Sequence, residues 1–147
     1  RAMVLSIAVG PLLALASAAP AGAGQVTEHA RENRPLVLFG AHWSAPCLAE
    51  YRSLPDIVAA AHPNRVVLAW IDEPIQVPAA LAGKIEALPT NEARRLATRL
   101  LGEGYGLPSA VVLGTREQAC AIVRAPLRES LVRSMLDRCG SAKQEAN

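Results

Sequence analysis

The chain has 147 residues, a length that suits one ordinary domain with its own hydrophobic core. Its residues are 51% hydrophobic and only 3% aromatic, and 15 basic and 13 acidic side chains give a formal charge of +2. This balance excludes a long disordered chain, and charges scattered without blocks leave no basic surface for nucleic acid.

Residues 1–23 have the pattern of a signal peptide. A short apolar core follows Arg1, a Gly-Pro pair interrupts it, and small residues after it offer cleavage sites that end at Ala18 and Ala23. A membrane-spanning helix needs about 20 continuous apolar residues, so the pattern favours export with cleavage over an uncleaved anchor. We expect residues 24–147 to form the mature domain in the periplasm or outside the cell, without membrane contact after cleavage.

Four short apolar runs downstream are typical of buried strands, because they do not alternate with polar residues and turn residues or polar residues flank them. The expected strands are Leu36–Phe39, Val66–Ile71, Ala110–Leu113 and Ala121–Val123.

Segments of helical character lie before, between and after these strands. The first is the polar stretch Val26–Asn33. In the other three, apolar residues at steps of three and four predict helices with one buried stripe. These are Pro46–Ala61, with a kink at Pro55, Glu92–Leu101 and Leu127–Cys139. Thr90 or Asn91 is expected to cap the helix Glu92–Leu101, while Gly102 and Gly140 are expected to end the last two. Strands that alternate with helices predict a layered α/β domain.

The chemistry-bearing motif lies between the first strand and the helix after it. Trp43 and Ser44 are followed by Pro46, Cys47 and Glu50. This stretch resembles the thioredoxin superfamily, and specifically its exported thiol:disulfide reductases related to cytochrome maturation. In that branch a strand leads into Trp-Cys-x-Pro-Cys, with a glutamate three residues later. Ser44 stands where that motif has its first cysteine.

The resemblance extends over residues 35–139. Tyr105–Ser109 precedes the third strand as the family's cis-proline loop does, which implies a cis Pro108 that faces Cys47. The turn at Arg124–Leu127 and the amphipathic helix after it resemble the family's closing elements. The implied fold class is α/β, a thioredoxin-like three-layer sandwich with a central mixed sheet and flanking helices.

A cysteine at a helix N-terminus is suited to thiol chemistry because the helix dipole and free N–H groups stabilise the thiolate. Serine cannot replace a thiol in disulfide exchange, so Ser44 and Cys47 cannot cycle between dithiol and disulfide. Three interpretations of Cys47 stay open. In the first, Cys47 is a small buried hydrophobic residue, Ser44 is the N-cap and Pro46 lies in the first turn of the helix. In the second, Cys47 is a monothiol that forms mixed disulfides with partners. In the third, Cys47 and His42 are soft ligands for a metal or haem.

Other residues near the motif have two interpretations each. Glu50 lies one helical turn after Cys47, where a carboxylate can shuttle a proton or raise the thiol pKa, or it is a solvated surface residue. His42 is a catalytic candidate or simply a half-exposed side chain at a strand exit. Trp43 is expected to form part of the apolar surface around the site.

Two functions follow from these observations. The chain is a thioredoxin-like protein with at most weak monothiol exchange through Cys47, or a non-catalytic module that binds peptides or partner proteins in the groove beside Pro108. The expected partners are protein thiols or peptides. No cofactor, resident metal or nucleic acid is expected, and the protein is expected to be a monomer.

The other two cysteines are predicted to form a structural disulfide, because disulfides persist in exported proteins. Cys120 opens the last strand and Cys139 closes the last helix, which folds back after the turn at Pro126. Five strand steps cover roughly 16 Å and twelve helix steps cover roughly 18 Å, so both cysteines reach the same end of the domain. Cys47 is then the free thiol of an odd count. The alternative is that Cys120 and Cys139 are two unpaired buried cysteines.

Overall fold

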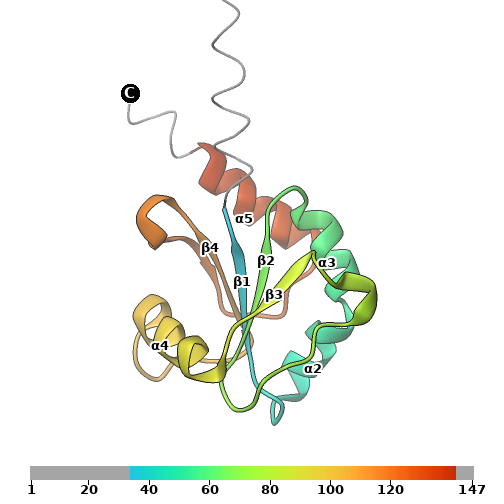
Figure 1. Cartoon of the computed structure of the whole chain (residues 1–147). Coiled ribbons are helices and arrows are strands. Elements are labelled where there is room, and N and C mark those ends of the chain that lie inside the picture. Colours follow the sequence, from blue (N-terminus) through green and yellow to red (C-terminus); the bar gives the residue numbers. More distant parts are fainter. Residues whose placement is uncertain (1–33, 142–147) are drawn as a thin grey trace, which may run out of the picture.

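Five strands form one mixed sheet at the centre of residues 34–141, the part of the chain that the computed structural model describes (Figure 1). The sheet order is β3-β2-β1-β4-β5, with β1 parallel to β2 and antiparallel to β4. The strands are β1 (Leu36–Gly40), β2 (Val66–Trp70), β3 (Ile85–Ala87), β4 (Ser109–Leu113) and β5 (Ala119–Val123). The predicted signal peptide and the predicted helix over residues 26–33 lie outside the described residues.

The four predicted strands are present, with small shifts of their ends. Every residue of β1 and β2 is buried, as an apolar run without alternation predicts for central strands. A fifth strand, β3, was not predicted from the sequence, and it pairs in parallel with β2. Its three residues, with Glu86 in the middle, are too few to show a strand pattern.

Within residues 34–141 four α-helices accompany the sheet, namely α2 (Ala45–Arg52), α3 (Leu54–Ala61), α4 (Thr90–Leu101) and α5 (Glu129–Ser141). The single helix expected over Pro46–Ala61 is two helices that meet at Ser53. Pro55 has no N–H to donate to the carbonyl of Tyr51, so the expected kink becomes a complete break.

The ends of the last two helices differ from the predicted ends. Pro89, rather than Thr90 or Asn91, occupies the N-cap position of α4, whereas Gly102 ends this helix as predicted, with a φ of 85°. The prediction that Gly140 ends α5 was wrong, because the helix continues to Ser141. Assigned helix ends commonly vary by one or two residues. The later end of α5 does not change which face of that helix is buried.

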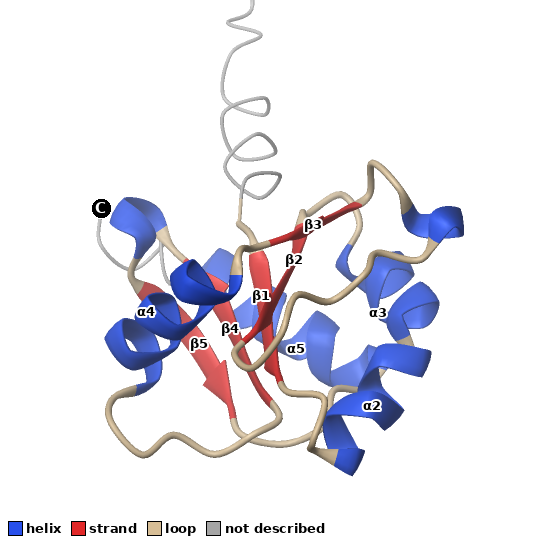
Figure 2. Ribbon diagram, turned by 60° about the horizontal axis from the view of Figure 1, so that its bottom comes forward, coloured by secondary structure: helices blue, strands red, loops and turns tan. Residues whose placement is uncertain are grey.

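The two faces of the sheet carry two separate hydrophobic clusters, so the domain has three layers (Figure 2). Side chains of Leu36 and Leu38 pack with residues of α2, α3 and α5, whereas Val37 and Phe39 pack with residues of α4. Alternation of side chains along a strand produces this division. Three helices therefore cover one face, and α4 is the only described helix over the other.

The strand register defines two ends of the sheet. Phe39 pairs with Ser109, so the carboxyl end of β1 lies beside the start of β4, and we call this end, with the loops that leave it, the site end. At the opposite end, which we call the far end, Leu113 pairs with Ala119. The Cys47 motif and Pro108 therefore belong to the same end of the domain.

Candidate functional site

The predicted site loop leaves β1 and enters α2 directly. Ser44 is the N-cap residue, Pro46 lies in the first turn, where its missing N–H is not needed, and Cys47 is the third helical residue. The thiol therefore lies at the positive end of the helix dipole. Cys47 is nevertheless completely buried, with an exposed fraction of 0%, and belongs to the core cluster that includes Leu36 and Leu38.

Ser44 holds the start of α2 through its backbone. Its carbonyl accepts a hydrogen bond from the N–H of Leu48 at 3.1 Å, and its own N–H donates to the carbonyl of Ala41 at 3.2 Å. The side chain makes no capping hydrogen bond, so only the position of Ser44 agrees with the interpretation as an N-cap.

The Pro108 loop faces the same end of the sheet. The peptide bond between Leu107 and Pro108 is cis, and Pro108 is buried. Directly after it, Ser109 Oγ donates a hydrogen bond to the carbonyl of Gly106 at 2.7 Å. The loop is thereby fixed beside the carboxyl end of β1.

Hydrogen bonds between His42 and Asp72 anchor the start of the site loop. His42 N–H donates to Asp72 Oδ2 at 2.7 Å, and His42 Nδ1 lies 3.1 Å from Asp72 Oδ1. Partial burial by itself raises the pKa of Asp72, but the hydrogen bonds from His42 and Glu73 outweigh it and hold this pKa below its usual value. Trp43, the next residue, projects outward with 72% of its surface exposed.

Glu50 is the most unusual side chain of the site. Its exposed fraction is only 3%, so the interpretation as a solvated surface residue was wrong. Glu50 Oε1 accepts a hydrogen bond from the backbone N–H of Leu127 at 2.6 Å, while Oε2 is buried and has no hydrogen-bond partner among the described residues. Burial raises the pKa of Glu50 to about 7, and the hydrogen bond from Leu127 only partly opposes this shift.

Solved structures provide a comparison for this arrangement. A thiol:disulfide interchange protein of the thioredoxin family from Chlorobium tepidum TLS matches with a TM-score of 0.51 and 15% identity, over 78% of this chain and 84% of that one. The chain has a thioredoxin-like fold. The exposed lipoprotein thioredoxin of Streptococcus pneumoniae strain TIGR4 matches with a TM-score of 0.49 and 15% identity, over 76% of this chain and 88% of that one.

At such identities the likeness concerns the fold and says nothing about the residues of the site. No family model matches the chain, and no curated protein matches its sequence. The fold class predicted from the sequence is thus confirmed, whereas the role of each site residue in this thioredoxin-like domain is a matter for proposal.

Sequence reasoning missed the aromatic cluster beneath the site loop. Trp70, at the end of β2, is buried and contacts His42 and Tyr51 edge-on, with ring centroids 6.4 and 6.1 Å apart. A Cβ atom added to Gly40 would lie 2.7 Å from the Trp70 ring, so only glycine leaves room for it. The sequence did contain a signal for this packing, because one predicted central strand is followed by a glycine and the next contains a tryptophan near its end.

The far end of this thioredoxin-like domain holds the other two cysteines. Cys120 and Cys139 form a disulfide, with Cα atoms 5.7 Å apart, and Cys47 is free. This is the pairing that the strand and helix lengths predict. Cys120 lies at the start of β5 and Cys139 near the end of α5, so the bond joins these two elements away from the site loop.

The described residues offer little to hold a metal ion. Within residues 34–141 no group of three or more His, Cys, Asp or Glu side chains gathers at one point. His42 is instead engaged with Asp72, and Cys47 is buried. None of the described helices is both long and apolar enough to cross a membrane.

Proposed function

We propose that the chain is an exported thioredoxin-like protein that contacts partner proteins at its site end and carries out at most slow monothiol exchange through Cys47. The observation that carries this proposal is the complete burial of the chain's only free thiol one turn after Ser44. A Cys47 thiolate can attack a partner disulfide, form a mixed disulfide and release the partner's second sulfur as a thiolate. Ser44 cannot attack this mixed disulfide, so no second group in the motif can release the partner from Cys47.

The rate at which Cys47 reacts with a thiol reagent tests the proposal. The protein with its disulfide intact presents one thiol, and we expect it to react at least about 10-fold more slowly when native than when unfolded, because the sulfur must first become exposed. A native rate equal to the unfolded rate would contradict slow exchange. A complete absence of reaction until unfolding would favour the second candidate function.

The second candidate is a non-catalytic binding module, and the exposure of Trp43 favours it. A large apolar side chain that is 72% exposed beside a buried thiol is suited to contact with a partner rather than to chemistry. Under this hypothesis Trp43→Ala weakens capture of a partner, whereas Cys47→Ala leaves capture unchanged. A loss of capture with Cys47→Ala, reversed by a reductant in the wild type, would instead identify mixed disulfides.

Restoring the missing cysteine tests whether the rest of the frame is competent. We expect Ser44→Cys to create measurable disulfide reductase activity, since Trp43, Pro46, Cys47 and Pro108 already match the motif that the chain resembles. Insulin reduction is the assay, and Ser44→Ala is the matched control because it removes the hydroxyl without adding a thiol. A folded Ser44→Cys protein with no more activity than this control would contradict the expectation.

We propose that Glu50 takes up the proton that Cys47 releases. The two residues are one helical turn apart on the buried side of α2, and burial raises the pKa of Glu50 to about 7. We expect Glu50→Gln to slow the reaction of Cys47 with a thiol reagent. An unchanged rate in a folded variant would show that Glu50 only makes the structural contact with Leu127.

Export is supported by two features of different kinds. The first 23 residues have the pattern of a signal peptide, and the domain contains a disulfide, a bond that persists outside the cytosol. We propose a periplasmic or secreted location, with cleavage after Ala18 or Ala23. Intact-mass analysis of protein from the extracytoplasmic fraction tests this, and retention of Met3 there would indicate an anchored form.

A further inference from the structure

The far-end disulfide joins two cysteines that differ sharply in exposure. Cys120, on β5, is exposed to solvent, whereas Cys139, on α5, has an exposed fraction of only 1%. Among the described strands β5 is an edge strand that pairs with β4 alone, so its outer side is open next to Cys120. An exposed disulfide can be attacked directly by a thiolate, whereas a bond buried on both sides opens only when the protein unfolds. One sulfur of this bond is therefore within reach of another protein.

An irregularity in β5 turns Cys120 toward α5. The pairing of β4 with β5 skips Cys120, because consecutive residues of β4 pair with Ala119 and Ala121. Ala121 packs in the core cluster that includes Met135 of α5, so regular alternation would place Cys120 on the opposite face of the sheet. The extra residue is a β-bulge, a feature that re-aims a side chain and is common next to functional sites. The bulge allows the Cα atoms of Cys120 and Cys139 to lie 5.7 Å apart.

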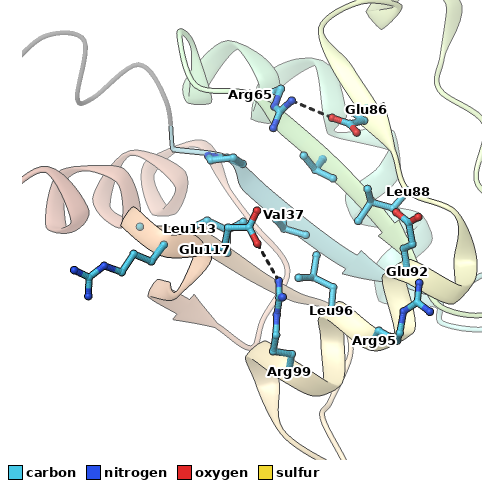
Figure 3. Close-up of a pocket in the computed structure, with 14 residues that line it drawn as sticks. Val37, Arg65, Glu86, Leu88, Glu92, Arg95, Leu96, Arg99, Leu113 and Glu117 are labelled. Carbon is cyan, nitrogen blue, oxygen red and sulfur yellow. Dashed lines mark ion pairs between the residues drawn. The ribbon is translucent and has the colours of Figure 1, made fainter.

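Other contacts hold both cysteines in place independently of the bond between them. The turn just before Cys120 is tied to α4 by an ion pair between Arg99 and Glu117 at 3.6 Å (Figure 3). On the other side, α5 is anchored in the core by Val132 and Met135, which are both completely buried. We therefore expect the two thiols to stay close together after reduction, so that the bond can form again.

A small depression borders the disulfide. Its volume is about 220 Å³, and both Cys120 and Cys139 line it. Within the part of the chain that the structure describes, Arg34 is the only charged residue of its lining. A positive charge favours the approach of a thiolate and stabilises the thiolate that leaves. This matters for Cys139, because the helix dipole disfavours a negative charge near the C-terminal end of α5.

We propose that the disulfide between Cys120 and Cys139 is a second exchange site, which oxidises a partner protein that carries two neighbouring thiols. One partner thiolate attacks Cys120 Sγ and forms a mixed disulfide, while the bond to Cys139 breaks and Cys139 leaves as a thiolate. The partner's second thiolate then attacks the partner's own sulfur in the mixed disulfide and releases Cys120. Both released thiolates take up protons, which balance the two that the partner thiols lose. Two electrons pass to this chain, and the partner becomes a disulfide.

The second exchange site has the capacity that the Cys47 motif lacks. The chain has three cysteines, and Ser44 leaves Cys47 without a second thiol in its motif. Cys120 and Cys139 are therefore the one bonded pair that can take up and release two electrons within the molecule. This activity does not depend on Cys47, because the two sites lie at opposite ends of the sheet.

Reduction of the native protein by dithiothreitol tests whether the bond opens without unfolding. We expect the rate to rise in proportion to the dithiothreitol concentration and to exceed the rate of global unfolding by at least about 10-fold, because Cys120 is already exposed. Alkylation followed by peptide mass analysis measures the thiols at positions 120 and 139. A rate that levels off at the unfolding rate would overturn the proposal, because the folded protein would then be closed to attack.

A trapping experiment identifies the sulfur that is attacked. The probe is a reduced thioredoxin whose second active-site cysteine is replaced by serine, because this protein cannot release itself from a mixed disulfide. We expect peptide mass analysis to find the probe bonded to Cys120. A probe bonded to Cys139 instead would overturn the proposal, and so would the absence of any mixed disulfide at the far end.

Two matched variants separate exposure from a general loosening of the fold. In a Cys47→Ala background, Cys139→Ser leaves Cys120 as the single thiol, and Cys120→Ser leaves Cys139. Both proteins have lost the same disulfide, so any loosening affects them alike. We expect the thiol of Cys120 to react with iodoacetamide at least about 10-fold faster than the thiol of Cys139. Equal rates, or a faster reaction of Cys139, would contradict the assignment of Cys120 as the sulfur that partners attack.

Discussion

The last helix, α5, is tied to the rest of the domain at both ends by two different kinds of bond. At the site end, the backbone N–H of Leu127 donates to the buried carboxyl of Glu50 at 2.6 Å. At the far end, Cys139 is bonded covalently to Cys120. The first contact depends on the protonation of a buried acid and the second on the redox state of the surroundings, so one helix is subject to two independent influences.

The two ends also differ in how well their polar groups are satisfied. At the site end, Glu50 Oε2 and Trp70 Nε1 are buried and have no hydrogen-bond partner among the described residues. At the far end, the sulfurs of Cys120 and Cys139 are bonded to each other and leave no free thiol. Unpartnered buried polar atoms lower stability, so the site end is expected to open more readily than the far end.

Loss of the far-end bond is expected to have the largest effect. Replacing Cys120 and Cys139 by serine should lower the free energy of unfolding by about 3 kcal/mol, because a closed loop of this size restricts the unfolded chain by about that amount. Urea denaturation measures the loss. Adding a reductant should destabilise the wild type and leave the double variant unchanged. If the two proteins were equally stable under oxidising conditions, the disulfide would not stabilise the fold.

The site-end bond is expected to make stability depend on pH. The pKa of Glu50 is raised from 4.5 to about 7 in the folded protein, so the unfolded chain loses this proton first as the pH rises. Stability should therefore fall through this pH range, by about 3 kcal/mol in total for this group, and then become constant.

Denaturation of the wild type and of Glu50→Gln at pH 4.5 and pH 7.5 isolates this effect, because both proteins share every other titrating group. Glutamine keeps an oxygen that can accept the hydrogen bond from Leu127 and has no proton to lose. The difference in stability between the two proteins should shift in favour of the variant at the higher pH. A difference that is the same at both values would mean that Glu50 titrates alike in the folded and unfolded chains.

The packing of Trp70 at the site end offers a test that involves no charge. Gly40→Ala places a methyl group 2.7 Å from the indole ring, and overpacking of this kind should cost about 2 kcal/mol. Gly106→Ala is the matched control, because nothing lies within 4 Å of its added Cβ. Thermal unfolding compares the two variants, and equal effects would show that Trp70 moves aside without cost.

The smallest effect is expected at the contact between His42 and Asp72. Asp72→Ala should cost up to about 1 kcal/mol at neutral pH, because the pair is partly exposed to solvent. The pKa of Asp72 is lowered in the folded protein, so this contribution is present at neutral pH and is lost as the pH falls through that value. Asp72→Asn should lose less stability, because its amide oxygen can still accept a hydrogen bond from the His42 N–H. If Asp72→Ala lost the same stability at pH 7 and at pH 3, the contribution would not depend on the charge of Asp72.

The sequence predicted the features that depend on neighbouring residues. The apolar runs of β1 and β2 predicted buried central strands, and Gly102 predicted the end of α4. Simple lengths of strand and helix were enough to bring Cys120 to Cys139. These features follow from backbone geometry and hydrophobic periodicity, which act over a few residues.

Tertiary structure alone decided the environment of the site. Glu50 could lie in solvent or in the core, and the choice depended on Leu127, 77 residues further along the chain, whose N–H meets its carboxyl group. Likewise, the Gly40 position opens to Trp70 only because β1 and β2 pair in register. Whether a polar or aromatic side chain is buried depends on which distant segments pack over it. The neighbouring residues in the sequence do not determine that packing.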